Sequence, residues 1–189
     1  MAAGGLDTGL GRVTEPAWRS FVESVAETLD IGPGSRVFEV GCGAGALLYP
    51  LAENGYIVGG LDQSPTLVGY ARQAMPEGRF MVGDAAALDP AEPWDVVLAC
   101  GLFRHFPNLD YARGVLARMA AKATHAIAIL DVPDLDRKEK ASGLDHLFYD
   151  RGWMFHALAE IGASAVQIED QKIEGYANAR FRFNVFARL

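Results

Sequence analysis

This sequence has few cysteines, no excess of positive charge and no long apolar runs, and each of these features excludes a class of protein. The 189 residues include two cysteines, Cys42 and Cys100, which are too few for a disulfide framework. Seventeen basic residues stand against 24 acidic ones, and this balance disfavours a polyanion-binding surface. No apolar run approaches the roughly 18 residues of a transmembrane helix, and we expect no leader segment. We therefore expect a cytoplasmic protein that binds neither membrane nor nucleic acid.

The composition that remains is typical of a globular domain. Hydrophobic residues make up 50% of the chain and charged residues 22%. A chain of this length buries enough surface to build a core without disulfides or metal ions. It shows no internal repeat, low-complexity tract or linker, so we expect a single domain over residues 1–189.

Hydrophobic periodicity predicts helices that alternate with strands. Apolar residues at helical spacing predict helices at residues 15–30, 44–54, 65–75, 110–122 and 151–161. Short β-branched runs predict strands at residues 36–40, 56–61, 79–82, 94–99, 126–130, 165–169 and 181–187. Thr14, Ser64 and Asp150 are the expected N-caps.

This order of elements predicts an α/β fold with a doubly wound, mostly parallel sheet. Strands that alternate with helices form βαβ units, with helices on both faces of the sheet. The last two strands have no helix between them, so we expect them to form a C-terminal antiparallel hairpin. In such sheets the ligand binds at the carboxyl ends of the strands, so the residues just after each strand carry the functional argument.

A glycine-rich turn follows the first predicted strand, within Glu39-Val40-Gly41-Cys42-Gly43-Ala44-Gly45. Glycines let the backbone approach a ligand closely and adopt unusual φ angles. The spacing fits both the G-x-G-x-x-A dinucleotide fingerprint and G-x-G-x-G, so by itself it does not separate two cofactor classes. A plain tight turn is the structural alternative.

Carboxylates follow the next two predicted strands. Asp62 can accept hydrogen bonds from both hydroxyls of a ribose, although it is also placed as an acid flanking the next helix. Asp84, within Gly83-Asp84-Ala85, can accept from an exocyclic adenine amine beside a backbone N–H for a ring nitrogen. An ordinary turn is the alternative at that position.

The ordered set of these motifs, completed by Trp94-Asp95-Val96-Val97, resembles the class I S-adenosylmethionine-dependent methyltransferases. The resemblance covers nearly the whole chain, from about Thr14 onward. It implies a seven-stranded Rossmann-like sheet in the order 3-2-1-4-5-7-6, S-adenosylmethionine (SAM) as cofactor and S-adenosylhomocysteine (SAH) as product. With no appended nucleic-acid module in the sequence, it further implies a small-molecule methyl acceptor.

Roles in cofactor binding follow from the resemblance by position. Glu39 resembles the acid that orients the glycine loop and the methionine ammonium, although many relatives have aspartate there. Gly41 and Gly43 would pass under the cofactor, with the small Cys42 between them. The residues after the next two strands would hold the nucleoside: Asp62 the ribose hydroxyls, Gln63 the adenine face, and Asp84 with Ala85 the adenine edge.

The end of the fourth predicted strand would complete the site. Cys100 and Gly101 would lie along the methionine part of SAM. Relatives often have a His-His pair shortly after, where this chain has Arg104-His105. His105 is the candidate catalytic residue, because its pKa near neutrality suits a general base for an acceptor that must lose a proton. A pocket-wall role for His105 is the alternative, and His146 and Tyr149 are second-rank candidates.

Further expectations complete the sequence-based hypothesis. Residues 1–14 are expected to form an N-terminal lid, and residues 132–150 a segment that covers the substrate. No metal site is expected, because no two histidines share a ligand spacing. A non-catalytic SAM-binding protein of the same fold is the alternative function. An NAD(P)-dependent oxidoreductase is disfavoured, because Glu39 stands where dinucleotide-binding folds have an apolar strand residue.

Overall fold

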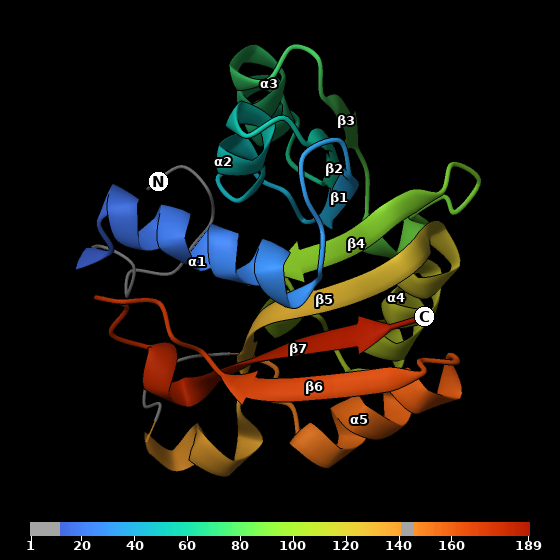
Figure 1. The fold of residues 1–189 in the computed structure, drawn as a ribbon. Helices are drawn as coiled ribbons and strands as arrows, with labels where there is room; N and C mark the ends of the chain where they lie inside the picture. Colours follow the sequence, from blue (N-terminus) through green and yellow to red (C-terminus); the bar gives the residue numbers. More distant parts are fainter. Residues whose placement is uncertain (1–11, 141–145) are drawn as a thin grey trace.

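A computed structural model describes residues 12–140 and 146–189 and contains a seven-stranded sheet in the order β3-β2-β1-β4-β5-β7-β6 (Figure 1). Strands β1 to β5 pair in parallel, and β7 runs antiparallel to both β5 and β6. The predicted fold class, strand order and C-terminal antiparallel hairpin are therefore confirmed. The strands are β1 (Arg36–Val40), β2 (Ile57–Asp62), β3 (Arg79–Val82), β4 (Trp94–Cys100), β5 (Ala123–Pro133), β6 (Ala165–Asp170) and β7 (Arg182–Arg188).

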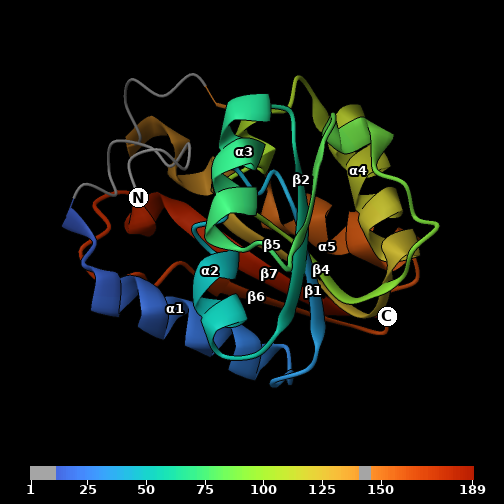
Figure 2. The ribbon, with the colours of Figure 1, turned by 90° about the horizontal axis from the view of Figure 1, so that it is seen from above.

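Helices cover the sheet on both faces, as Figure 2 shows from above. The helices α1 (Glu15–Thr28), α2 (Leu48–Glu53) and α3 (Pro65–Ala74) lie on one face. The helices α4 (Leu109–Lys122) and α5 (Arg151–Glu160) lie on the other. Alternate strand residues divide between the two cores: Val37 packs with the first group and Phe38 with the second. Both faces of the central strands are thus buried.

Local signals at the helix ends behave as the sequence predicts. The side chains of Thr14, Ser64 and Asp150 accept hydrogen bonds from backbone N–H groups in the first turns of α1, α3 and α5. Asn108 caps α4 in the same way, although the sequence analysis did not single it out. The predicted caps are therefore confirmed.

Two predicted boundaries were wrong. The helix expected from residue 44 begins at Leu48, because Gly45 has a positive φ angle that an α-helix cannot contain, so the glycine turn extends past residue 44. The fifth strand, expected at residues 126–130, spans Ala123–Pro133. Its pairing with β7 shifts register after Ile129 and then resumes, so the strand passes beyond the polar residue that ended the apolar run.

In the part of the chain that the structure describes, no helix combines the length and apolar character needed to cross a membrane. The N-terminal lid expected at residues 1–14 falls mostly outside the described residues. Of that segment, residues 12–14 lead directly into α1.

A matched pair of glycine substitutions tests the packing of the sheet. A Cβ on Gly59 in β2 would lie 2.6 Å from the buried Trp94 ring and 2.9 Å from the Arg79 carbonyl oxygen. Gly59→Ala should therefore lower the free energy of unfolding by roughly 1–3 kcal/mol. A Cβ on Gly69 in α3 would meet no described atom within 4 Å, so Gly69→Ala should raise it by about 0.5–1 kcal/mol. Urea unfolding measures both, and equal effects of the two substitutions would contradict the packing around Trp94.

Candidate active site

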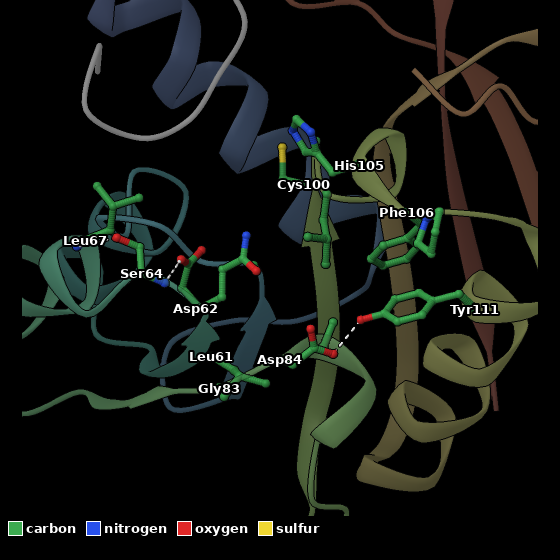
Figure 3. A pocket seen from close by; sticks show the side chains of 16 residues that line it. Leu61, Asp62, Ser64, Leu67, Gly83, Asp84, Cys100, His105, Phe106 and Tyr111 are labelled. Atoms are coloured by element: carbon green, nitrogen blue, oxygen red, sulfur yellow. Dashed lines mark hydrogen bonds between the residues drawn. The ribbon is translucent and has the colours of Figure 1, made fainter. Parts of the chain in front are cut away.

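A cavity of about 590 Å³ lies at the carboxyl edge of the parallel strands, within the usual size range of small-molecule sites (Figure 3). The structure brings eight of the residues predicted for the site to its wall: Gly41, Asp62, Gln63, Asp84, Ala85, Cys100, Gly101 and His105. Glu39 and Cys42 line a small adjoining chamber, which shares Gly41 and Cys100 with the main cavity. Gly43 lies outside both linings and contacts the site through its backbone.

Asp62, at the end of β2, ties the glycine loop to the start of α3. Its Oδ2 accepts from the Gly43 backbone N–H at 2.8 Å, and its Oδ1 accepts from the Ser64 backbone N–H at 2.8 Å. An ionised carboxylate has about four lone-pair sites, so two remain for ligand hydroxyls. Asp62 therefore organises the glycine loop, a role that the sequence did not predict. It also keeps lone pairs that can accept hydrogen bonds from ligand hydroxyls, which is the role that the sequence predicted.

Tyr111 is a site residue that sequence analysis missed. Its hydroxyl donates to Asp84 Oδ1 at 2.5 Å, and the same oxygen accepts from the Ala86 backbone N–H at 2.8 Å. Burial and the bond to Asp84 raise the pKa of the Tyr111 hydroxyl, which keeps it a donor. In Figure 3, Tyr111 reaches from α4 across to Asp84, with Phe106 beside it. Nothing in the sequence links residues 27 positions apart, so only the fold shows this pair.

Glu39 is a buried carboxyl whose Oε2 meets no hydrogen-bond donor in the described part of the chain. Its side chain is 3% exposed, and its Oε2 has no partner among the described residues. The neighbouring indole of Trp18 donates to the Ala46 carbonyl instead. Burial, reinforced by the charge of Asp62, raises the pKa of the Glu39 carboxyl well above its usual range. Because an unpaired buried carboxylate is costly, this position favours a cationic ligand.

The two cysteines line the same small chamber as Glu39 and are unreactive thiols. Burial raises the pKa of both Cys42 and Cys100, and the charge of Glu39 raises it further. A nucleophilic cysteine requires the opposite shift. Both residues therefore serve as small side chains beside the cavity. Within residues 12–140 and 146–189, no group of three or more His, Cys, Asp or Glu side chains is arranged to hold a metal ion.

His105 stands at the mouth of the cavity on a 3₁₀ turn, Phe103–His105. Arg104 Nε donates to His105 Nε2 at 3.2 Å. Burial and the positive charges of Arg104 and Arg182 lower the pKa of His105. Because a guanidinium only donates, the ring is neutral and carries its proton on Nδ1. In this arrangement the lone pair of His105 Nε2 is occupied, and it becomes available only when Arg104 moves away.

The segment expected to cover the substrate packs against the loop after β4. Its described residues include a short 3₁₀ helix, Leu135–Lys140. The Leu147 backbone N–H donates to the Arg104 carbonyl, and the buried Tyr149 hydroxyl donates to the Phe103 carbonyl at 2.9 Å. His146 lies edge-on to His105, with ring centroids 6.0 Å apart. Residues 141–145, within the same expected segment, lie outside the described residues.

The sequence matches known methyltransferases. A family model described as a methyltransferase domain matches residues 37–125. The chain is 28% identical over 158 residues to the ubiquinone biosynthesis O-methyltransferase of Rhodopseudomonas palustris (strain BisA53), which covers 82% of this chain and 55% of that protein. The chain thus spans about half the length of the curated relatives it matches.

Solved structures of methyltransferases share the fold. The magnesium protoporphyrin IX methyltransferase of Synechocystis PCC 6803, crystallised with SAH, matches with a TM-score of 0.70 and 21% identity over 97% of this chain and 86% of its own. CalS10, an amino pentose methyltransferase of Micromonospora echinaspora crystallised with SAM, matches with a TM-score of 0.75 and 17% identity over 91% of this chain and 92% of its own. At these low sequence identities, the comparison with the solved structures shows a shared fold and nothing more.

The matched domain, the strand order and the ordered residues at the strand ends agree with one another. They confirm the resemblance seen in the sequence. Residues 37–125 match a methyltransferase domain, and the described chain shares the fold of solved methyltransferases.

Proposed function

We propose that the chain transfers a methyl group from SAM to a small-molecule acceptor by in-line displacement and releases SAH. The observation that carries this proposal is the buried Glu39 Oε2 beside the wall of the main cavity, which has no donor among residues 12–140 and 146–189. The amino acid part of SAM ends in an ammonium group that satisfies such an oxygen. A nicotinamide dinucleotide has no ammonium to place there, so the same observation disfavours the oxidoreductase alternative.

The other parts of SAM would contact the cavity residues that follow strands β3, β2 and β4. Asp84 and Ala85 after β3, with Gln63, would hold the adenine, and the free lone pairs of Asp62 after β2 would hold the ribose. Cys100 and Gly101 after β4 would lie along the methionine chain. The sulfonium methyl of SAM is the electrophile, so the protein's contribution is to position the acceptor and to exclude water.

His105 is proposed as the catalytic residue that contacts the acceptor. It lines the cavity next to Gly101, beyond the proposed methionine end. If the acceptor carries a proton, His105 Nε2 takes it after Arg104 Nε releases that nitrogen. Residues 132–150 would cover the acceptor, because their described part packs on the loop that holds His105.

The proposed partners are confined to this cofactor and a small-molecule acceptor. The acidic charge balance of the chain argues against nucleic acid and against an anionic membrane surface. Two unpaired cysteines suit the reducing cytoplasm, which is the proposed compartment.

Calorimetric titration tests the cofactor proposal. SAM and SAH should bind, and NAD should not compete. Asp62→Ala should weaken SAM binding by roughly 10- to 150-fold, because each charge-assisted hydrogen bond contributes about 1.5–3 kcal/mol. Asp89→Ala is the matched control, since Asp89 also accepts a backbone N–H but lies outside the cavity lining. Binding of NAD without binding of SAM would overturn the proposed function.

The raised pKa of Glu39 predicts that SAM binding releases a proton. Below that pKa the free protein holds Glu39 protonated, and a bound ammonium favours its ionised form. Calorimetric titration in buffers of different ionisation enthalpy should show the proton release, and Glu39→Gln should bind SAM more weakly and release no proton.

The pKa of Glu39 is higher in the folded protein than in the unfolded chain, so stability falls as the pH rises from the unfolded pKa to the folded pKa. Glu39→Gln should therefore raise the ligand-free Tm at high pH, and equal proton release in the variant would remove Glu39 from the site.

Substitution of His105 tests its catalytic role. His105→Ala should lower kcat by roughly 10²–10⁴-fold with little change in SAM affinity. Because the pKa of His105 is lowered, the neutral base persists below the ordinary histidine range, so activity should fall only in more acidic solution. The exposed His156 on α5 provides the control, His156→Ala. An unchanged kcat in His105→Ala would leave proximity and orientation as the whole mechanism.

A further inference from the structure

Tyr111 joins two segments at the end of the cavity where the proposed function places adenine. It stands in the first turn of α4, and its backbone N–H donates to Oδ1 of the capping Asn108 at 2.9 Å. Its side chain lines the cavity and extends to Asp84 in the turn after β3 (Figure 3). Because the cap fixes the start of the helix, it also fixes where the Tyr111 side chain begins its reach toward that turn.

One oxygen of the Asp84 carboxylate is fully engaged with the protein. Oδ1 accepts from the Tyr111 hydroxyl at 2.5 Å and from the Ala86 backbone N–H at 2.8 Å. Each carboxylate oxygen offers about two lone-pair sites, so these two donors saturate Oδ1. Oδ2 is therefore the oxygen that is left to accept a hydrogen bond from a ligand.

The two donors come from different elements, and together they fix the orientation of the carboxylate. Ala86 belongs to the short 3₁₀ helix Ala85–Ala87 that Asp84 itself caps, whereas Tyr111 belongs to α4. The terminal torsion of an aspartate is broad, so with the local donor alone the carboxylate could turn and still keep one hydrogen bond. The second donor, 27 positions away in the sequence, removes that freedom. Oδ2 then presents its lone pairs in one direction.

The chemistry of Oδ2 distinguishes between purine bases. A carboxylate oxygen accepts hydrogen bonds and cannot donate them. It suits the 6-amino group of adenine, whereas the carbonyl oxygen of a 6-oxopurine would face it as a second acceptor. A site built to pair with a donor strongly rejects an analogue that lacks this donor, because its own polar group is left unpaired. This selectivity holds only while Asp84 cannot turn away from the base.

The ring of Tyr111 is held independently of its hydroxyl. It packs against Phe106 with ring centroids 4.8 Å apart and an interplanar angle of 56°, and Phe106 packs against Phe103 at 4.7 Å. A phenylalanine at position 111 would keep these ring contacts. Tyr111→Phe therefore removes the hydroxyl alone and separates its role from that of the ring in the cavity wall.

We propose that Tyr111 is a positioning residue that makes the cofactor site selective for a 6-aminopurine nucleoside, by holding Asp84 with Oδ2 toward the base. The inference rests on the proposed function, which places adenine beside Asp84. It goes further by assigning to a residue of α4 a selectivity that Asp84 alone does not secure. A purely structural tie between α4 and the turn after β3 would instead support all bound nucleosides alike.

Calorimetric competition between SAH and its 6-oxo analogue tests the proposal. In this analogue a carbonyl oxygen replaces the amino group of the adenine. The unsubstituted protein should bind SAH about 100-fold or more tightly than the analogue. Tyr111→Phe should reduce this preference by about tenfold, through weaker binding of SAH. No preference in the unsubstituted protein, or an unchanged preference in the variant, would overturn the proposal, even if both affinities fall together.

Tyr56→Phe is the matched control. The Tyr56 hydroxyl also donates to a protein oxygen, the Ile31 carbonyl at 3.1 Å, and Tyr56 lies outside the cavity lining. Its removal should leave the preference for SAH unchanged. Failure of SAH to bind the unsubstituted protein contradicts the proposed function itself, whereas SAH binding with an unchanged preference in Tyr111→Phe contradicts only this inference.

Asp84→Asn tests the same geometry and decides the question if Tyr111→Phe does not fold. The two donors should hold the amide oxygen at the position of Oδ1, which turns the amide N–H groups toward the base. The preference for SAH should therefore fall by more than about tenfold. Where both variants fold, adding Tyr111→Phe to Asp84→Asn should lower the preference no further, because the two residues act as one unit. An unchanged preference in Asp84→Asn, or additive losses in the double variant, would contradict the positioning role.

Discussion

Burial of both faces of the sheet is the constraint on which the site depends. With α1 to α3 on one face and α4 and α5 on the other, the central strands can carry polar side chains only near their ends. The glycine loop after β1 is open enough for a ligand, and Asp62 holds it by accepting from both Gly43 and Ser64. One carboxylate thereby joins the ends of two strands and the start of α3 into one rigid edge.

Glu39 is a buried group at this edge that opposes folding but favours binding. Its Oε2 has no hydrogen-bond partner among the described residues. Burial, together with the charge of Asp62, raises the pKa of its carboxyl. An unpaired carboxylate costs stability in the ligand-free protein, because charge is poorly solvated in the interior. The same position suits a cationic group of a ligand.

Sequence reasoning succeeded where a function depends on neighbouring residues. The strand order, the hairpin and the caps at Thr14, Ser64 and Asp150 follow from periodicity and local hydrogen bonding, which act over a few residues. The predicted start of α2 was wrong because Gly41, Gly43 and Gly45 adopt positive φ angles and extend the turn. These φ angles depend on the surrounding structure. The length of β5 was missed for a related reason, since pairing with β7 carries the strand past Asp131.

What the sequence by itself determined is the order of strand-end residues and hence the cofactor side of the cavity. Each of these residues follows its own strand directly, and parallel strands bring their carboxyl ends to one edge. Only the tertiary structure decided the contacts between distant segments: Tyr111 with Asp84, Arg104 and Arg182 with Asp131, and the tautomer of His105. Such contacts depend on side-chain directions across packed elements, and these directions are set by the packing of the whole chain.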